Sequence, residues 1–351
     1  MTSNSLNSFP EKARIAFFAV GGKAGDHLEV IAKRDDVIVT ALCDLKTAAL
    51  DAGRTKLAAK YSADQVASIR ATTDAMELAA DVTCDCAFLA IPNPARIPVV
   101  KRLISRGIPL LMEKPAAHSL EDFDSLLALQ RDAGSLVMVS QNYRFSSGAM
   151  LVRRLLREQE IGEIETITGS FQRNHRRASR LYYGTLPGPI PFRIEMVIHH
   201  MDMVAYWLGS PPERVVADGF RTPTSWGIGD TGCDILARFA NGARLNYHGD
   251  WSAASSETGW NGHWIITGSQ GVLTWRGENQ VQLKRRHADP FRDDGDCVEF
   301  HAPQEEDPLI TIHSEFFSAL REGRTPESSL EENAASFRLC LQAATQNALS
   351  C

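Results

Sequence analysis

The chain has 351 residues, a formal net charge of −6 and an apolar content of 44%. That length favours two domains of about 150 residues each, and the acidic balance gives no reason to expect binding to nucleic acid or to an anionic membrane. No apolar run approaches the roughly 20 residues that a membrane-spanning helix needs. The polar start MTSNSLNSFPEK and the scattered cysteines favour a cytoplasmic protein with reduced thiols.

The first 140 residues alternate between short apolar runs and helical segments. The apolar runs predict strands at 14–20, 37–44, 86–91, 108–112 and 135–141, and the segments between them predict helices at 26–34, 46–60, 99–106 and 120–132. Such alternation is typical of a parallel sheet with helices on both faces. We therefore expect an α/β domain at residues 11–140.

After residue 150 the pattern changes. Helices are expected at 151–158, 195–208, 307–320 and 330–348, and strands at 164–171, 234–240, 243–251, 263–268 and 271–275. Asn241-Gly242 between two of these strands is a strong hairpin signal, whereas residues 286–307 look like a loop. The second half, residues 141–351, is therefore predicted to be an α+β domain with a mostly antiparallel sheet.

The turn after the first strand carries a dinucleotide-binding pattern. Ala19, Gly21 and Ala24 occupy the three positions of the G-x-G-x-x-G/A fingerprint, between a buried strand and a helix. Gly21 would let the backbone approach a pyrophosphate, and the following helix N-terminus would hold it. Asp44 ends the second strand, where a carboxylate accepts ribose hydroxyls and repels a 2′-phosphate. We therefore expect a Rossmann domain that binds NAD, with NADP as the alternative.

Lys114 ends a predicted strand of the same sheet, within Glu113-Lys114-Pro115. Ligands of such sheets bind outside the carboxyl ends of the strands. An ammonium there can stabilise negative charge on the oxygen of an alcohol as it is deprotonated. The alternative is a surface lysine before a turn.

The predicted helix at 195–208 carries the second candidate group. Glu195, His199 and Asp202 fall on one helical face, and a carboxylate one turn from a histidine can set its tautomer and raise its basicity. His199 is therefore a candidate general acid or base, whereas His200 is rotated about 100° away. A structurally hydrogen-bonded histidine is the alternative, and the spacing gives little support for a metal site.

The predicted loop at 172–193 is rich in arginine and also carries Tyr182 and Tyr183. One or two of its arginines, Arg176 foremost, could bind an anionic group of a substrate or a cofactor phosphate. A solvated basic loop is an equal alternative. Trp251, Trp260, His263 and Trp264 cluster near a strand turn, where they could serve the core, an interface or a sugar-stacking surface.

Together these motifs resemble the Gfo/Idh/MocA family of oxidoreductases, which includes glucose–fructose oxidoreductase and inositol 2-dehydrogenase. The resemblance runs over roughly residues 13–349 and rests on the Gly turn, Asp44, Pro92-Asn93, Glu113-Lys114-Pro115, Gln141-Asn142-Tyr143-Arg144-Phe145 and His199-x-x-Asp202. Three positions depart from the family: Ala19 replaces a glycine, Arg96 stands where histidine is frequent, and Glu195 replaces aspartate.

The resemblance implies a Rossmann domain, then an α+β domain whose open sheet is often buried in a homodimer or homotetramer. It implies that Lys114 and His199 are catalytic, with Glu195 and Asp202 beside them. The implied cofactor site comprises Gly21, Gly22, Lys23, Ala24, Asp44, Pro92, Asn93, Arg96, Glu113, Lys114 and Gln141, and the expected substrate-binding residues are Arg144, Arg176, Tyr183 and His200. No metal is expected.

The expected activity is hydride transfer between a nicotinamide and a carbinol carbon of a sugar, polyol or sugar acid. One alternative is a glycoside-cleaving enzyme that uses bound NAD for a transient oxidation. Another is a non-catalytic regulator that senses NAD(P), which the presence of both Lys114 and His199 disfavours.

Overall fold

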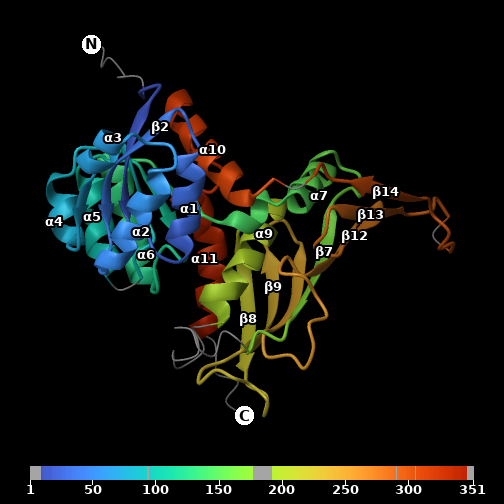
Figure 1. Cartoon of the computed structure of the whole chain (residues 1–351). Coiled ribbons are helices and arrows are strands. Elements are labelled where there is room, and N and C mark those ends of the chain that lie inside the picture. Colours follow the sequence, from blue (N-terminus) through green and yellow to red (C-terminus); the bar gives the residue numbers. More distant parts are fainter. Residues whose placement is uncertain (1–8, 93–94, 177–191, 290, 305, 346–351) are drawn as a thin grey trace. The chain divides into compact units, whose positions relative to one another are not determined.

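The computed structural model of the chain describes residues 9–92, 95–176, 192–289, 291–304 and 306–345. The chain forms two compact units, Met1–Ser140 with Leu309–Glu332 and Gln141–Pro308 with Asn333–Cys351. Each unit contains its own β-sheet (Figure 1). None of the helices in the described ranges combines the length and the apolar character that crossing a bilayer requires.

The first unit is a doubly wound Rossmann fold. Within the described residues its six strands run in the order β3-β2-β1-β4-β5-β6, and all of the pairings are parallel. The strands are β1 (Ala13–Phe18), β2 (Val37–Cys43), β3 (Arg70–Thr72), β4 (Cys86–Leu89), β5 (Leu110–Glu113) and β6 (Val137–Ser140). The helices are α1 (Lys23–Ala32), α2 (Thr47–Leu57), α3 (Ala63–Ser68), α4 (Ala75–Asp81), α5 (Arg96–Ser105) and α6 (Leu120–Ala133). Continuous burial along β4 and β6 confirms that the sheet is covered on both faces.

A helix from the far end of the sequence completes this unit. α10 (Pro308–Glu322) buries Ile312, His313, Phe316 and Phe317, and the backbone N–H of Val139 in β6 donates to the Ser328 carbonyl at 2.8 Å. This arrangement differs from the predicted division at residues 11–140 and 141–351. The amphipathic pattern of α10 shows that one face must be buried, but it does not show which core that face joins.

The second unit is built on an eight-stranded sheet in the order β14-β13-β12-β11-β7-β10-β9-β8, as far as the described residues show. The β7–β10 pair is parallel and the other pairs are antiparallel. The strands are β7 (Ile164–Gln172), β8 (Pro212–Phe220), β9 (Gly232–Phe239), β10 (Arg244–Asp250), β11 (His263–Gly268), β12 (Gly271–Trp275), β13 (Gln280–Arg285) and β14 (Cys297–His301). The expected α+β domain with a large, mostly antiparallel open sheet is therefore confirmed.

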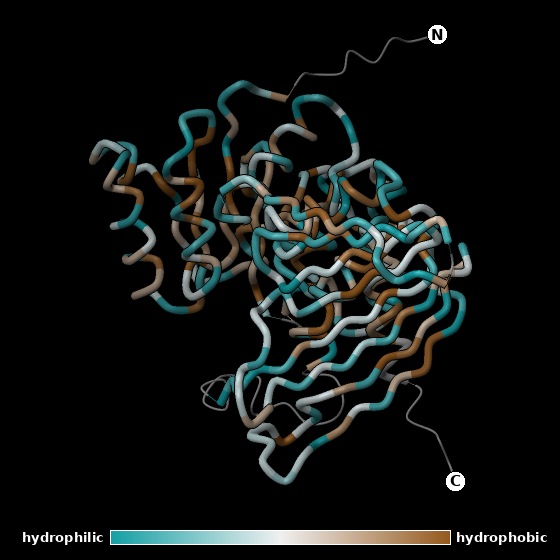
Figure 2. The backbone as a smooth tube through the Cα atoms, turned by 90° about the vertical axis from the view of Figure 1, so that its right-hand side faces the viewer, coloured by the Kyte–Doolittle hydropathy of each residue, from teal (hydrophilic) through white to brown (hydrophobic). Residues whose placement is uncertain are grey.

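Helical segments cover one face of this sheet. They are the 3₁₀-helix η1 (Asn142–Phe145), α7 (Ser147–Arg157), the π-helix η4 (Arg193–Val197), α9 (Ile198–Leu208) and α11 (Leu330–Thr345). Fully buried aromatic side chains of the unit include Phe171, Tyr247, Trp264 and Trp275. Along β9 buried and exposed residues alternate, and Figure 2 shows similar alternation of hydrophobic and hydrophilic residues along the sheet.

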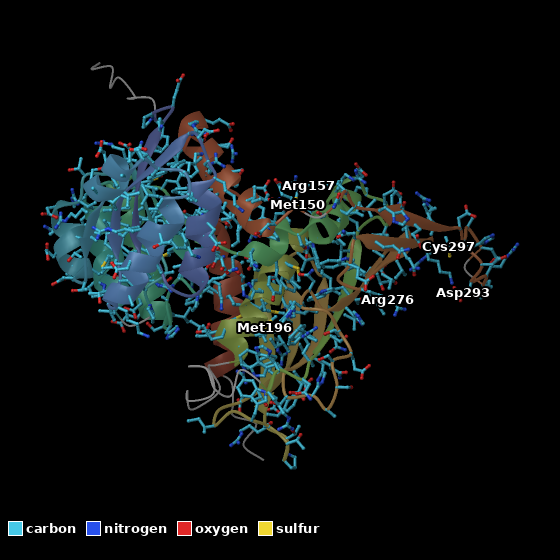
Figure 3. All side chains as sticks on the ribbon, in the orientation of Figure 1. Met150, Arg157, Met196, Arg276, Asp293 and Cys297 are labelled. Atoms are coloured by element: carbon cyan, nitrogen blue, oxygen red, sulfur yellow. The ribbon has the colours of Figure 1, made fainter. Side chains whose placement is uncertain are left out.

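Several elements differ from the sequence prediction. β3, β8 and β13 are not predicted, and β14 lies within 286–307, which the sequence predicts to be a loop. In the part of the chain that the structure describes, β14 pairs with β13 alone and is mostly exposed, so it lacks the apolar run that marks a core strand. Figure 3 shows Asp293 and Cys297 in this part of the unit. The predicted helix 195–208 begins at Arg193 with the π turn, which carries Met196 (Figure 3).

Candidate active site

The turn between β1 and α1 is shaped to receive a phosphate. Gly22 is the N-cap of α1, and no side chain among the described residues caps the helix, so its first N–H groups remain available at the positive end of the helix dipole. Gly22 has a φ of 54° and Ala19 a φ of 88°. Ala19 thus keeps a backbone conformation that favours glycine, at the position where the fingerprint normally has one.

Asp44 lies beside this turn, at the end of β2. Its Oδ2 accepts hydrogen bonds from the backbone N–H groups of Val20 and Gly21 at 3.1 and 3.2 Å, and its Oδ1 accepts from Lys46 N at 3.0 Å. A Cβ on Gly21 would lie 3.6 Å from Oδ2, an ordinary contact distance, so the carboxylate lies directly beside this glycine. The uncapped helix and this carboxylate fit the phosphates and the ribose diol of a dinucleotide.

Lys114 follows the last residue of β5 and is half-buried. The Lys114–Pro115 peptide bond is cis. Arg96, which is buried in the first turn of α5, donates to the carbonyl oxygens of Ile91, Glu113 and Pro115. One guanidinium therefore holds the backbone on both sides of Lys114 as well as the segment after β4. These contacts position the backbone around Lys114, and the expected contact of Arg96 with the cofactor stays a prediction.

Glu113 is tied to a buried chain of two histidines. His27 Nε2 donates to Glu113 Oε1 at 2.8 Å, and His27 Nδ1 lies 3.0 Å from Nε2 of His313 on α10. Burial raises the pKa of Glu113, but the His27 hydrogen bond and the charges of Lys114 and Arg96 outweigh it and hold that pKa below its ordinary value. An ionised Glu113 therefore precedes Lys114 in the chain. Its carboxylate is held by His27 of α1, which is in turn bonded to His313 of α10. Sequence reasoning missed both histidines.

His199 in the second unit stacks on an aromatic ring. The rings of Tyr143 and His199 lie 4.2 Å apart between centroids, at an interplanar angle of 11°. Tyr143 belongs to η1 and His199 to the first turn of α9, and both elements belong to the second unit. The stack fixes the plane of the imidazole, a role that the sequence does not assign to Tyr143. Glu195 lies in the π turn, whose wider spacing differs from the α-helical i, i+4 geometry assumed for its partnership with His199.

Asp202 forms a buried ion pair with Arg144. Arg144 Nε and Nη2 donate to the two carboxylate oxygens at 2.7 and 2.5 Å, and both side chains are almost completely buried. Asn333 Nδ2 and Ser336 Oγ donate to Asp202 Oδ1 at 3.3 and 3.4 Å. Asp202 was expected beside the catalytic histidine and Arg144 at the substrate. Their mutual contacts fasten η1, with Tyr143, to α9, and their expected roles at the histidine and at the substrate stay predictions.

His200 is fully buried behind His199. Its Nε2 donates to the Trp260 carbonyl at 2.9 Å and its Nδ1 accepts from the Tyr247 hydroxyl at 2.7 Å. Burial lowers the pKa of His200 to about 4, against the effect of the Trp260 hydrogen bond. Both ring nitrogens of this neutral imidazole are hydrogen-bonded within the second unit, where they tie α9 to β10 and to Trp260, and the expected contact of His200 with substrate stays a prediction.

The remaining expected residues have varied surroundings. Lys23 is exposed and pairs with Asp26 at 3.2 Å, Ala24 is buried in α1, and Pro92 is exposed. Gln141 is buried, and its Nε2 donates to Asn333 at 3.4 Å. Arg176 is exposed and donates to the Thr224 carbonyl at 3.2 Å. Asn93 and Tyr183 lie outside the described residues.

Comparisons with known proteins match both halves of the chain. Residues 13–141 match the oxidoreductase family with an NAD-binding Rossmann fold, and residues 149–274 match the GFO/IDH/MocA C-terminal domain. The chain belongs to the Gfo/Idh/MocA oxidoreductase family. Its Rossmann unit is therefore the NAD-binding domain of that family, as the Gly turn and Asp44 predict.

Three similar proteins illustrate the range of the family. Inositol 2-dehydrogenase of Rhizobium meliloti is 25% identical over 282 residues, which are 79% of this chain and 80% of that protein. The uncharacterized protein y4oX of Sinorhizobium fredii is 28% identical over 239 residues, covering 67% of this chain but 63% of its own length. An oxidoreductase of Agrobacterium radiobacter, solved with NAD+, L-tartaric acid and magnesium, superposes with a TM-score of 0.82 at 19% identity over 96% of this chain and 97% of its own.

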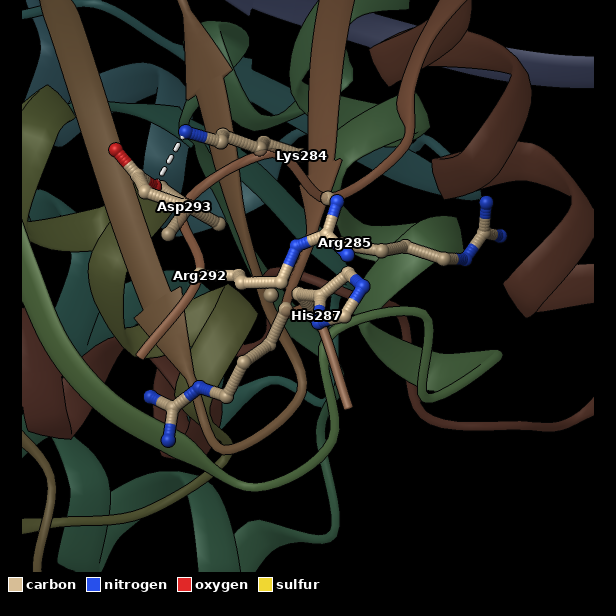
Figure 4. A pocket seen from close by; sticks show the side chains of 9 residues that line it. Lys284, Arg285, His287, Arg292 and Asp293 are labelled. Carbon is tan, nitrogen blue, oxygen red and sulfur yellow. Dashed lines mark hydrogen bonds and ion pairs between the residues drawn. The ribbon is translucent and has the colours of Figure 1, made fainter. Parts of the chain in front are cut away.

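This family member also has a basic pocket away from these residues. It lies between β12, β13 and the following loop, has a volume of about 130 Å³ and is lined by Lys284, Arg285, His287 and Arg292 (Figure 4). Its cations are neutralised by carboxylates: Lys284 pairs with Asp293 at 2.6 Å, Arg285 with Glu160 and Arg292 with Asp294. This pocket therefore has little attraction left for an anion.

Proposed function

We propose that the protein is an NAD-dependent dehydrogenase in which Lys114 and His199 act on a carbinol carbon of a sugar, polyol or sugar acid. One observation carries the proposal. Lys114 directly follows β5, a strand of the same sheet whose β1–α1 turn and Asp44 are the proposed dinucleotide cradle. Ligands of such folds bind outside the carboxyl ends of the strands, so the ammonium belongs to the cofactor side of the sheet.

Two features support a catalytic role for Lys114. The ionised Glu113 is its neighbour in sequence, and Arg96 fixes the backbone on either side of Lys114. An ammonium held in this way donates a hydrogen bond to the reacting oxygen and stabilises the charge that develops on it. The same contact polarises a carbonyl in the reverse reaction.

His199 is the proposed proton carrier. Its ring is held by the Tyr143 stack, and that stack is fastened by the Arg144–Asp202 pair. In the oxidative direction the hydroxyl proton of the substrate passes to the imidazole, and the C–H bond breaks as its hydride leaves. Bound NAD+ supplies the acceptor for that hydride. The products are a carbonyl compound, NADH and a proton. Glu195 remains the proposed carboxylate partner of His199.

Asp44 favours NAD over NADP because its carboxylate would repel a 2′-phosphate. Asp44→Ser should weaken NAD binding and narrow the preference for NAD, as measured by titrating intrinsic fluorescence with each cofactor. Lys101→Ala on α5 is a control variant away from the cradle. An unchanged ratio of the two affinities in Asp44→Ser would count against this assignment.

The activity is tested by absorbance at 340 nm with NAD+ and a panel of polyols, sugars and sugar acids. Lys114→Ala should abolish turnover but keep cofactor affinity close to that of the parent, because an interaction used in the transition state is lost. Lys101→Ala should turn over normally. Release of a sugar without net NADH would favour the glycoside-cleaving alternative, and cofactor binding with neither reaction would favour a sensor.

We also propose that the open sheet of the second unit mediates a homodimer or homotetramer. One row of outward residues crosses neighbouring strands in register: Val216, Leu236, Asn246, Thr168 and Ile265. Leu236 is 55% exposed and Ile265 47%, which is unusual for large apolar side chains on one surface. Leu236→Lys should shift sedimentation toward the monomer, whereas Arg157→Ala on α7 should not.

A further inference from the structure

The loop after β7 fixes one arginine against an aromatic ring. Arg173 donates through its backbone N–H to the Asp250 carbonyl at 2.9 Å and through Nη1 to the Thr258 carbonyl at 2.7 Å. Its guanidinium carbon lies 4.6 Å from the centroid of the Trp260 ring, a cation–π distance. Trp260 is 39% exposed, so this guanidinium is held in place at a surface that ligands can reach.

Arg173 belongs to the same cluster as His199. The Trp260 carbonyl accepts the hydrogen bond of His200, the neighbour of His199 in sequence. The ring that stacks on His199 is Tyr143. Burial raises the pKa of Tyr143, and the positive charge of Arg173 opposes that rise. The charge of Arg173 therefore acts on the Tyr143 ring, which stacks on His199, the proposed proton acceptor.

The charge of Arg173 has no carboxylate partner among the residues that the structure describes. The nearest acid along its backbone contacts, Asp250, uses its own carboxylate to accept from Ser252 N at 2.7 Å, and burial raises the pKa of Asp250. The sequence of residues 172–193 contains no Asp or Glu. This situation contrasts with the basic pocket of Figure 4, where carboxylates neutralise the cations.

We propose that Arg173 binds the carboxylate of the substrate, so that the site selects a hydroxylated acid over a neutral polyol or sugar. The inference rests on the proposed function and refines it. A guanidinium with one arm fixed on a carbonyl still offers Nε and Nη2 as donors, and this planar pair matches the two oxygens of a carboxylate. A single positive charge also matches a carboxylate better than a phosphate dianion. Trp260 would hold the guanidinium and offer ring surface to the sugar carbons.

The experiment compares acids with their amides, which keep the shape but lose the charge. The probes are D-gluconate with D-gluconamide and D-galacturonate with D-galacturonamide, and D-glucose 6-phosphate with D-glucose tests for a phosphate site. Binding is measured by calorimetry with NAD-loaded protein, and turnover at 340 nm. In the parent protein at least one acid should bind about 10- to 100-fold more tightly than its amide, as a charge-assisted hydrogen bond predicts.

Arg173→Met should remove the tighter binding of the acid while leaving the affinity for the amide unchanged. Arg173→Lys should keep part of the preference for the acid. Arg157→Met, at an exposed position on α7, is the control variant and should bind each compound like the parent. Circular dichroism checks that each variant is folded. The inference is overturned if no acid is preferred over its amide, if the preference survives in Arg173→Met, or if the phosphate ester alone is preferred.

The two proposals fail in different ways. If acids bind more tightly than their amides but no compound yields NADH, the dehydrogenase proposal is refuted and Arg173 remains an anion-binding residue. If NADH forms equally well from acids and from neutral compounds, the dehydrogenase proposal stands and the proposed role of Arg173 is refuted.

Discussion

The Arg144–Asp202 pair offers a sharp test of how the second unit is held together. Both side chains are almost completely buried, and two hydrogen bonds join them. Removing one partner leaves the other charge buried and uncompensated, which costs about 3–5 kcal/mol. Asp202→Asn and Arg144→Met should each lower the free energy of unfolding of this unit by that amount. The double variant Arg144→Met/Asp202→Leu should lose much less than the sum, because no charge then remains buried.

Tryptophan fluorescence in urea isolates this effect. All six tryptophans of the chain belong to the second unit, so their emission reports its unfolding. With an m-value of about 2 kcal/mol/M, each single variant should lower the urea midpoint by roughly 1.5–2.5 M. NAD affinity, a property of the other unit, should be unchanged. Single-variant shifts below about 0.5 M, or fully additive effects in the double variant, would refute a dominant role for this pair.

Three further predictions concern stability. Ala19→Gly should raise the free energy of unfolding by about 1 kcal/mol, because Ala19 has a φ of 88° that glycine adopts without strain. Ala24→Gly within α1 should lower the free energy of unfolding. Thermal melts followed by circular dichroism compare the two variants. Arg96→Met should lower the free energy of unfolding by about 3 kcal/mol, because several backbone carbonyls lose a charged donor. Amide hydrogen exchange around Lys114 should accelerate, and unchanged exchange would contradict the proposed role of Arg96 in holding this backbone. Burial lowers the pKa of His200 from an ordinary 6.5 to about 4, so its contribution is complete above pH 6.5 and lost as pH falls toward 4. By pH 5 the loss is about 2 kcal/mol, and His200→Gln should flatten the fluorescence-detected pH dependence.

Elements and turns are predicted correctly where residues close together in the sequence determine the local structure. The Gly turn, α1 and Asp44 follow from a strand–turn–helix pattern and one spacing, and the structure brings Asp44 to the Gly21 amide at 3.2 Å. The predicted strand before Lys114 is also present, since β5 ends at Glu113, whereas the catalytic role of Lys114 stays a prediction. The hairpin at Asn241-Gly242 follows from local turn chemistry alone, and Gly242 has the positive φ, 89°, that this turn requires.

Prediction fails where a partner is distant or the local geometry is irregular. Asp202 was assigned to the histidine face because three spacings matched an α-helix, but its partner Arg144 lies 58 residues away. His27 looks like an ordinary helical residue, since His313, with which it bonds, is 286 residues distant. The π turn at 193–197 shifts the spacing on which the pairing of Glu195 was based. Nothing in the local pattern signals any of these three.

The return of α10 to the first unit has a consequence for how the protein is made. A nascent chain that has reached residue 140 holds all of the Rossmann strands but not the helix that covers His27 and Phe88. That helix leaves the ribosome only after the whole intervening sheet has been synthesised. The nucleotide-binding unit is therefore encoded first but cannot be completed until residues 309–332 have been made, and a stop codon before residue 309 would damage a part of the protein that lies far upstream of it.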